Sequence, residues 1–302
     1  MNIIRKSGYE AKKRFYREGI ECNKVHWTVA AAATPGWAKR VFPDSSEAES
    51  YKLLWDDLFS LCRIGNGDHL SRWQEHDSFL RDTATKLNKL SFKSLYFTGP
   101  GTDLTVGLSS VARFHGGTSQ SSRNVRFEPN IPTEECFTTP DWRLCSGTVR
   151  ATRPFYINGV VISDLQLEIS EGVIVDFSSS TGEETFKAYI ASDEGASRLG
   201  EVALVDCSSP IFKTNRIYEE ILLDENAACH IAIGSGYRFC LDLPENTPDS
   251  EWNDVGCNQS SVHTDIMISD ENTNVHGTTS DGKVVKIISN GYWTDSIRNQ
   301  ST

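Results

Sequence analysis

The sequence predicts an α+β protein, in which a helical N-terminal segment is followed by a mixed, mainly antiparallel, β-rich domain with covering helices. Three observations support this class. Apolar residues recur at helical spacing between about residues 47 and 87, and short apolar runs bounded by turn residues dominate from residue 92 onward. Apolar residues make up 38% of the 302 residues, which is enough for a folded core. We therefore expect a helical lead-in over 1–91 and a β-rich domain over 92–302.

The lead-in is expected to contain two long helices. Asp44, Ser45 and Ser46 are candidate N-caps for a first helix over about 47–64, because their side-chain oxygens can accept from the free N–H groups of its first turn. Asn66-Gly67-Asp68 breaks that pattern, and a second helix follows over about 69–87. Before them, residues 25–33 resemble a buried strand and residues 37–43 a short helical turn ended by proline.

The second part is expected to consist of hairpins and short helices. A Gly99-Pro100-Gly101-Thr102 turn joins strands over 94–98 and 103–108. Asn158-Gly159 and Glu171-Gly172 join three strands, over 146–155, 159–169 and 173–178, into an antiparallel meander. The remaining expectations are a polar loop over 114–124, a helix with Thr181 and Glu184 as capping box, a helix over about 215–223, a surface loop over 242–260 and a hairpin across Asp281-Gly282.

Composition restricts the classes of binding partner and the cellular location that we expect for this protein. The net charge is −11, from 41 acidic and 30 basic residues without a basic block, so nucleic acid is not expected as a partner. The N-terminus lacks the apolar core of a signal peptide, and no apolar run reaches the ~20 residues that span a bilayer, so no membrane partner is expected. The eight cysteines form no Cys-x-x-Cys pair, so a structural zinc knuckle is not expected. Cys207 and Cys229 lie in apolar strands, which indicates buried reduced thiols and, with the missing signal peptide, a cytoplasmic location.

Candidate metal ligands lie on apolar strands. Glu201 opens Glu-Val-Ala-Leu-Val, and His230 lies inside Ala-Cys-His-Ile-Ala-Ile. A polar side chain in such a run is costly to bury unless it has a partner. His263 and Asp265 are two residues apart on a third run, so they share one face of a strand. The pair Glu134-Glu135, in a turn bounded by prolines, offers a further carboxylate.

Three carboxylates and two imidazoles suit a site for two divalent cations. A bridging carboxylate holds two cations ~3.5–4 Å apart, and the pair lowers the pKa of a shared water and polarises a carbonyl. The absence of thiolate ligands from the set disfavours a closed structural zinc site. Tyr237, seven residues after His230, is a candidate donor to the oxyanion that forms.

Each candidate also has a structural alternative. His230 alone could be a hydrogen-bonded core histidine, and Glu201 could neutralise Arg198. Glu134-Glu135 could be a solvated turn, and His263 could simply pair with Asp265. Tyr237 could be a packing residue. The joint occurrence of these residue types on apolar strands supports the metal interpretation. The other histidines, at positions 26, 69, 76, 115 and 276, are interpreted as structural or surface residues.

From residue 92 to its end, the chain resembles the aminopeptidase T/aminopeptidase S family of dinuclear metallopeptidases. The resemblance rests on Gly99-Pro-Gly-Thr-Asp-Leu-Thr, Asn130-Ile-Pro-Thr-Glu-Glu-Cys-Phe-Thr, Gly195-Ala-Ser-Arg-Leu-Gly-Glu-Val-Ala-Leu-Val, Asp224-Glu-Asn-Ala-Ala-Cys-His and Val262-His-Thr-Asp. It implies metal ligands at Glu135, Glu201, His230, His263 and Asp265, with Glu201 bridging. It also implies an active-site tyrosine at Tyr237, and it leaves Glu134 as a general base or a group that supports the ligands.

The activity that this resemblance implies is removal of the N-terminal residue from peptides by water activated between two cations, which would be zinc, cobalt, manganese or magnesium. Asp224 and Glu225 are then candidate partners for the free amine of the peptide. Relatives carry an N-terminal α/β domain that covers the site and helps to form a dimer. Most of that domain is expected to be missing here, with 1–91 its remnant or link, so a homodimer is left open. The alternatives are a metal-binding relative without activity and a two-metal hydrolase of esters or phosphates.

Overall fold

The computed structural model describes residues 11–12, 15–20, 23–65, 67–244 and 246–298. Residues 1–10, in which we expect no signal peptide, lie outside this part. So do Cys22 and Asn66, the first residue of the predicted helix break. Its helices are η1 (Phe15–Ile20), α2 (Pro35–Val41), α3 (Glu47–Leu61), α4 (His69–Leu90), η2 (Trp142–Leu144), α5 (Glu183–Ile190), η3 (Glu194–Ser197), α6 (Pro210–Lys213), α7 (Ile221–Asp224), η4 (Glu225–Ala227), η5 (Arg238–Cys240), α8 (Asp249–Asp254) and α9 (Asp295–Arg298).

Two antiparallel sheets form the body of the protein. The larger has the order β12-β11-β8-β3-β2-β16-β17-β18 and the smaller the order β15-β14-β13-β7. The strands of the larger sheet are β2 (Phe92–Gly99), β3 (Thr102–Gly107), β8 (Ser146–Arg150), β11 (Gln166–Ser170), β12 (Val173–Ser178), β16 (Asn274–Thr279), β17 (Val284–Ser289) and β18 (Tyr292–Trp293). Those of the smaller sheet are β7 (Cys136–Thr138), β13 (Leu199–Leu204), β14 (His230–Gly234) and β15 (His263–Met267).

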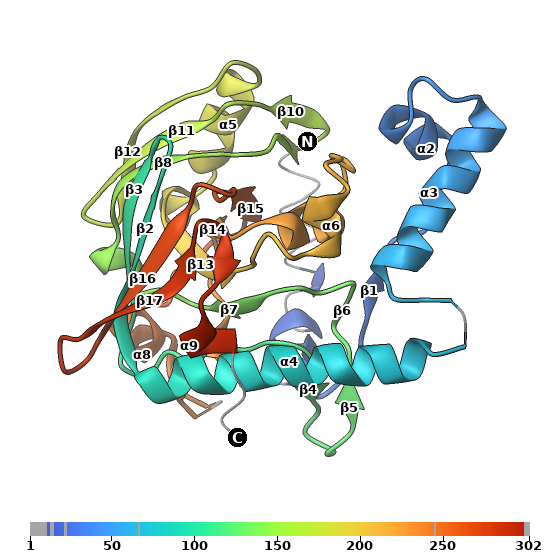
Figure 1. The fold of residues 1–302 in the computed structure, drawn as a ribbon. Coiled ribbons are helices and arrows are strands. Elements are labelled where there is room, and N and C mark those ends of the chain that lie inside the picture. The colour runs from blue at the N-terminus through green and yellow to red at the C-terminus, as the bar shows by residue number, and fades with distance from the viewer. Residues whose placement is uncertain (1–10, 13–14, 21–22, 66, 245, 299–302) are drawn as a thin grey trace.

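Three small two-stranded sheets complete the topology. They pair β1 (Val29–Ala30) with β6 (Asn130–Ile131), β4 (Ser119–Gln120) with β5 (Arg126–Phe127), and β9 (Phe155–Ile157) with β10 (Val160–Ile162). Figure 1 shows the larger sheet as a curved layer on one side, the smaller sheet inside it, and α4 along the lower edge.

The main hydrophobic core lies between the two sheets and α4. It includes Leu87 of α4, Phe97 of β2, Leu204 of β13 and Ile231 of β14, all of which are completely buried. A second cluster joins α2 and α3 to the segment over 211–227, with Leu54 of α3 packed near Tyr218. The smaller sheet is therefore held from one side by a continuous apolar core, which leaves its other side for polar side chains.

Most of the predicted elements are confirmed. Helices α3 and α4, the 94–108 hairpin and the hairpin across Asp281-Gly282 form at the expected places, and the hydroxyl of Ser46 accepts from Glu49 N as the N-cap of α3. The predicted buried strand over 25–33 is wrong, because only β1 forms there and it is exposed. The polar segments 114–124 and 242–260 contain β4 and α8, respectively.

The predicted meander and two helical details also need correction. Pro154, which has no N–H to donate, follows the end of β8, and Asp164 adopts a positive φ of 52° between β10 and β11. The strands predicted over 146–155 and 159–169 are therefore each broken in two. The N-cap of α5 is Gly182 without a side-chain cap, so the Thr181 capping box is wrong. Only the end of the helix expected over 215–223 forms, as α7, and the residues between α6 and α7 form a loop.

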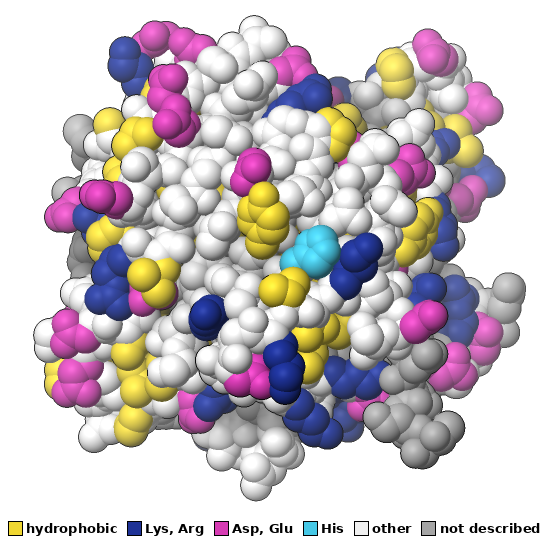
Figure 2. Space-filling view, turned by 60° about the vertical axis from the view of Figure 1, so that its left-hand side comes forward, with side chains coloured by type: hydrophobic (Ala, Val, Ile, Leu, Met, Phe, Trp, Pro, Cys, Tyr) yellow, Lys and Arg dark blue, Asp and Glu magenta, His cyan; other side chains and the backbone are white. Residues whose placement is uncertain are grey.

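The distribution of charged side chains on the surface and the free state of the cysteines both agree with the expectations from the composition. Figure 2, which brings the side with the larger sheet forward, shows acidic and basic side chains interspersed on that face. The described cysteines are free and buried at positions 62, 136, 145, 207, 229, 240 and 257. No helix among the described residues has the length and apolar character that crossing a membrane requires.

Candidate metal centre

The smaller sheet carries four of the five candidate ligands on one face. Glu201 of β13 and Asp265 of β15 are both cross-strand neighbours of Ala232 of β14. His263 pairs with Gly234 in the same way. Paired residues point to the same face of a sheet, so the small side chain of Ala232 lets the larger side chains of Glu201 and Asp265 approach each other. Glu135, the fifth candidate, directly precedes β7 at the edge next to β13.

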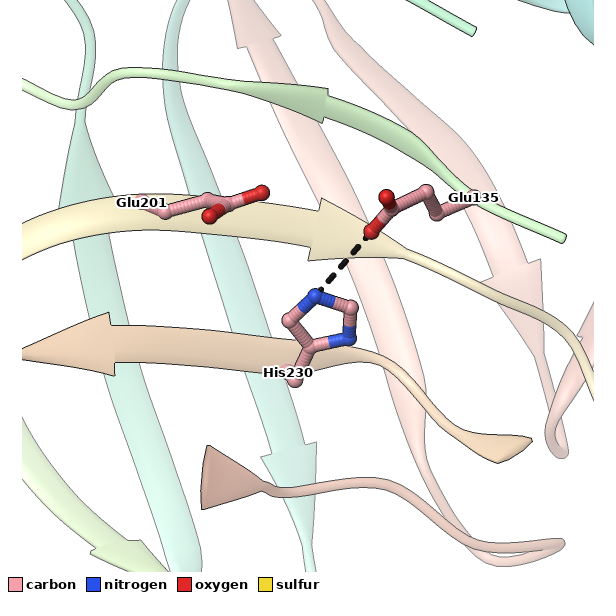
Figure 3. A group of neighbouring side chains, drawn as sticks. All are labelled: Glu135, Glu201 and His230. Carbon is pink, nitrogen blue, oxygen red and sulfur yellow. Dashed lines mark ion pairs between the residues drawn. The ribbon is translucent and has the colours of Figure 1, made fainter. Parts of the chain in front are cut away.

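The first group of side chains consists of Glu135, Glu201 and His230, and all three are buried. One potential ligand atom from each lies within 4.8 Å of those of the other two. Nε2 of His230 is 3.1 Å from Oε2 of Glu135, as the dashed line in Figure 3 shows. Residues that are 95 positions apart in the chain thus meet at one point, which the sequence alone could only suggest.

The second group consists of Glu201, His263 and Asp265, again within 4.8 Å of one another. Nε2 of His263 lies 3.3 Å from Oε2 of Glu201 and 3.5 Å from Oδ1 of Asp265. Glu201 belongs to both groups, which is the arrangement that a bridging carboxylate requires. All five candidates therefore form one continuous cluster.

The hydrogen bonds of the two histidines explain why this cluster suits a cation. Nδ1 of His230 is 3.1 Å from the carbonyl oxygen of Ala228, and Nδ1 of His263 is 2.8 Å from that of Ser235. A carbonyl oxygen only accepts, so both Nδ1 atoms carry protons and direct the Nε2 atoms at carboxylates. A neutral Nε2 and a carboxylate oxygen are both acceptors, and only a proton or a metal ion between them makes the contact favourable. The set of nitrogen and oxygen donors fits a divalent metal.

In the metal-free protein, the pKa values of the side chains in this cluster show the same need for positive charge. Burial lowers the pKa of His230, but the hydrogen bond and charge of Glu135 outweigh it and raise that pKa to about 9. Burial and the charges of Glu135 and Asp265 raise the pKa of Glu201 to about 7, against the hydrogen bond from His263. Glu201 and His230 therefore retain protons near neutral pH, and a cation could replace them.

Tyr237 lies beside the second group. Its hydroxyl oxygen is 3.2 Å from Nε2 of His263, and its ring stacks on Phe239 at a centroid distance of 5.2 Å. Burial and the nearby carboxylates raise the pKa of Tyr237 well above its usual value, so the phenol keeps its proton. It can therefore donate a hydrogen bond at the edge of the cluster.

The side chain of Glu134 contacts different residues from those that Glu135 contacts. Nη2 of Arg63 lies 2.7 Å from Oε1 of Glu134 and donates to Oε2 at 2.9 Å. Burial raises the pKa of Glu134 to about 7 despite this ion pair. The structure thus places Glu134 next to the candidate ligand in sequence, but outside the two ligand groups. Its expected role as a general base stays a prediction.

Glu225 is the carboxyl group of the cluster that sequence reasoning did not count among the ligands. It hydrogen-bonds to Asp265, and burial together with the charges of Asp265, Glu135 and Glu201 raises its pKa well above the usual value. The neighbouring Asp224 instead accepts from Tyr218 N at 2.9 Å and from Glu220 N at 3.3 Å. The sequence feature that could have indicated Glu225 was its position five residues before His230, in the segment that carried the family resemblance.

The purely structural roles that the sequence left open for these residues explain fewer of the observed contacts than a metal site does. Arg198 pairs with Glu194 and stacks over the ring of Trp142 at 3.9 Å, so its described partners do not include Glu201. The pair Glu134-Glu135 is buried rather than a solvated turn. His263 does contact Asp265, but it contacts Glu201 and Tyr237 as well.

Comparison with known proteins supports the same class of site. The sequence model of a family described as thermophilic metalloprotease (M29) matches residues 1–293. Aminopeptidase 2 of Geobacillus stearothermophilus is 40% identical over 278 residues, covering 92% of this chain and 67% of that protein. Aminopeptidase T of Thermus aquaticus is 39% identical over 288 residues, covering 94% and 70%. The solved structure of wild-type AmpT from Thermus thermophilus superposes with a TM-score of 0.83 at 36% identity, covering 95% of this chain and 71% of that one.

The fold and the cluster therefore define a metal-dependent hydrolase. The chain belongs to the thermophilic metalloprotease family M29, whose curated relatives are named aminopeptidases. It spans about two thirds of the length of those relatives.

Proposed function

We propose that this protein is an aminopeptidase that hydrolyses the N-terminal peptide bond of peptides at a centre of two divalent cations. The observation that carries the proposal is the meeting of two ligand groups at the shared carboxylate Glu201. Zinc, cobalt, manganese and magnesium stay open as the metal, because nitrogen and oxygen donors accept all four. A homodimer and a cytoplasmic location stay predictions, as does a domain boundary near residue 92.

The ligands divide between the two cations. Glu135 and His230 would hold one, His263 and Asp265 the other, and Glu201 would bridge them. Glu225 hydrogen-bonds to Asp265, and burial with the charges of the nearby carboxylates raises its pKa, so it keeps its proton beside the ligands. We therefore assign Glu225 to the surroundings of the metal centre, where it orients the carboxylate of Asp265.

The chemistry follows from this arrangement. When bound, the metal pair supplies an acidified water and polarises the carbonyl of the scissile bond. The protein fixes the two imidazoles through Ala228 and Ser235, so their orientation costs nothing during the reaction. The hydroxyl of Tyr237 donates to the carbonyl oxygen as negative charge develops on it. Water adds to the carbonyl carbon and gives up a proton, the C–N bond breaks, and that proton is passed to the nitrogen of the leaving amine.

A leucyl p-nitroanilide assay tests the proposal. The chain is stripped with chelator and then titrated with Co²⁺, Zn²⁺, Mn²⁺ or Mg²⁺, and release of p-nitroaniline is followed. We expect activity only with metal, and none on the N-acetylated substrate, because an aminopeptidase requires a free amine. Metal uptake without turnover would favour the non-catalytic relative. Turnover of p-nitrophenyl esters or phosphates without turnover of the anilide would favour a different hydrolase.

A further inference from the structure

The backbone just before Glu135 is held by side chains from two distant segments. Nε2 of His76, on α4, donates to the carbonyl oxygen of Thr133 at 2.6 Å. The side-chain oxygen of Asn226, on η4, accepts from the N–H of Glu134 at 2.6 Å. These contacts fix the peptide units that lead into Glu135, and therefore the point from which its carboxylate reaches His230.

The side chain of Glu134 anchors the same stretch from the other direction. It is 9% exposed, and its carboxylate contacts the guanidinium of Arg63 through both oxygens. Nε2 of His76 lies 3.6 Å from Oε2 of Glu134. Removing one member of a buried ion pair leaves an uncompensated charge, which strongly favours rearrangement of the other member. The position of Glu134 thus depends on Arg63.

Arg63 is itself held in place for this contact. It lies in the turn between α3 and α4 with a positive φ of 58°, and its guanidinium lies 5.5 Å from the ring centroid of Trp73. Because Nε2 of His76 donates to a carbonyl, Nδ1 is free to accept from Nη2 of Arg63, 3.1 Å away. Arg63, His76 and Glu134 therefore form one connected unit, in which Nη2 of Arg63 donates to Nδ1 of His76 and to Oε2 of Glu134.

We infer that Arg63 and His76 are positioning residues for the metal ligand Glu135 and that Arg63 acts through Glu134. This inference rests on the proposed function, in which Glu135 binds a metal. It makes the turn at Arg63 and helix α4 working parts of the metal centre. It also gives Glu134 a structural task, since its Oε2 accepts a hydrogen bond from Arg63 and its Oε1 lies 2.7 Å from the same guanidinium.

Cobalt affinity, measured by competition with a chromogenic chelator, tests the inference. We expect Arg63→Gln, His76→Phe and Glu134→Gln each to raise the Kd for Co²⁺ by roughly 10-fold or more, the range found when groups that orient metal ligands are removed. Arg63→Lys should recover part of the loss. Arg81→Gln is the matched control, because Arg81 of α4 also pairs with a buried carboxylate, that of Asp77, but has no contact to the 133–135 stretch.

A double variant separates positioning from general instability. If Arg63 acts through Glu134, Arg63→Gln with Glu134→Gln should raise the Kd no further than the worse single variant, because residues on one path are not additive. Additive losses would overturn the inference. Glu134→Gln keeps the shape of the side chain, so it provides the readout if Arg63→Gln does not fold. A loss of turnover in Glu134→Gln with unchanged Co²⁺ affinity would overturn the inference and support a general base.

Glu135→Gln distinguishes this inference from the proposed function. If Glu135→Gln weakens Co²⁺ binding but the Arg63, His76 and Glu134 variants match Arg81→Gln, the positioning inference fails and the metal centre stands. If the unaltered chain binds no Co²⁺, or Glu135→Gln leaves binding unchanged, the role of Glu135 as a ligand fails and the inference falls with it.

Discussion

The hydroxyl of Thr139 makes two hydrogen bonds with the backbone of Tyr237, accepting from its N–H and donating to its carbonyl oxygen, each at 2.9 Å. Thr139 is completely buried and follows β7, whereas Tyr237 follows β14. This pair closes the loop after β14 onto the far edge strand of the smaller sheet. It therefore sets the position of the Tyr237 hydroxyl next to His263.

We predict that Thr139→Val lowers kcat on aminoacyl p-nitroanilides by about 10-fold or more, because a small displacement of a catalytic group is costly in rate. Valine keeps the shape of threonine but removes both hydrogen bonds. The Kd for Co²⁺ should stay unchanged, because the described hydrogen bonds of the Thr139 hydroxyl go to the backbone of Tyr237 and to none of the candidate ligands. Normal kcat would show that Tyr237 does not need this anchor.

Tyr237→Phe removes the hydroxyl while it keeps the ring that stacks on Phe239. We predict a fall in kcat of about 10²-fold with little change in KM, because a donor to the developing oxyanion acts mainly in the transition state. Steady-state kinetics at saturating Co²⁺ measure this. Phe239→Leu is a control for packing in the same aromatic cluster. An equal loss in both variants would point to packing rather than to the hydroxyl.

His76 should make stability depend on pH. Burial and the charge of Arg63 lower its pKa from 6.5 to about 4, so the unfolded chain binds a proton at a higher pH than the folded chain does. The resulting contribution to the free energy of unfolding, at most about 3 kcal/mol, is fully present above pH 6.5 and is lost as pH falls toward 4. In urea unfolding of the metal-free protein, the free energy of unfolding of His76→Gln should therefore change less steeply with pH between 4 and 6.5 than that of the unaltered chain. The exposed His69→Gln should follow the unaltered chain, and parallel curves for His76→Gln would refute the prediction.

Asn258 links two segments that border the metal centre. Its amide nitrogen donates to Gly195 O at 2.7 Å and to Gly234 O at 2.5 Å, and the residue is buried. Asn258→Ala removes both hydrogen bonds, leaves Gly195 O with only the bond from Arg198 N, and should lower the free energy of unfolding by about 1–3 kcal/mol. Gln259→Ala, at a more exposed neighbouring position, should change it by less than about 0.5 kcal/mol. Similar losses in the two variants would contradict this account.

The sequence predicted the ligand strands because their signal is local. Glu201, His230 and His263 stand out as polar residues in apolar runs, and the two-residue spacing to Asp265 fixes their common face. Neither signal depends on contacts far away in the chain. The cross-strand pairs through Ala232 and Gly234 then complete the geometry.

Other parts of the structure leave no local pattern. Arg63 contacts Glu134 across 71 positions, and His76 contacts Thr133 across 57, so their roles emerge only in the folded chain. The segment over 215–223 has apolar residues that suit a helix. Instead, the carboxylate of Asp224 accepts the N–H groups of Tyr218 and Glu220 and stabilises a loop. Tertiary contacts of this kind override helix propensity.

The central claim is that five side chains from four strands and their ends bind a pair of divalent cations, and the metal content of the reconstituted chain tests it most directly. After exposure to Co²⁺ and removal of free ions, elemental analysis should find about two cobalt ions per chain, and far fewer in Glu201→Gln, because that carboxylate belongs to both ligand groups. An unaltered chain that retains no cobalt, or a Glu201→Gln chain that retains both ions, would contradict the account.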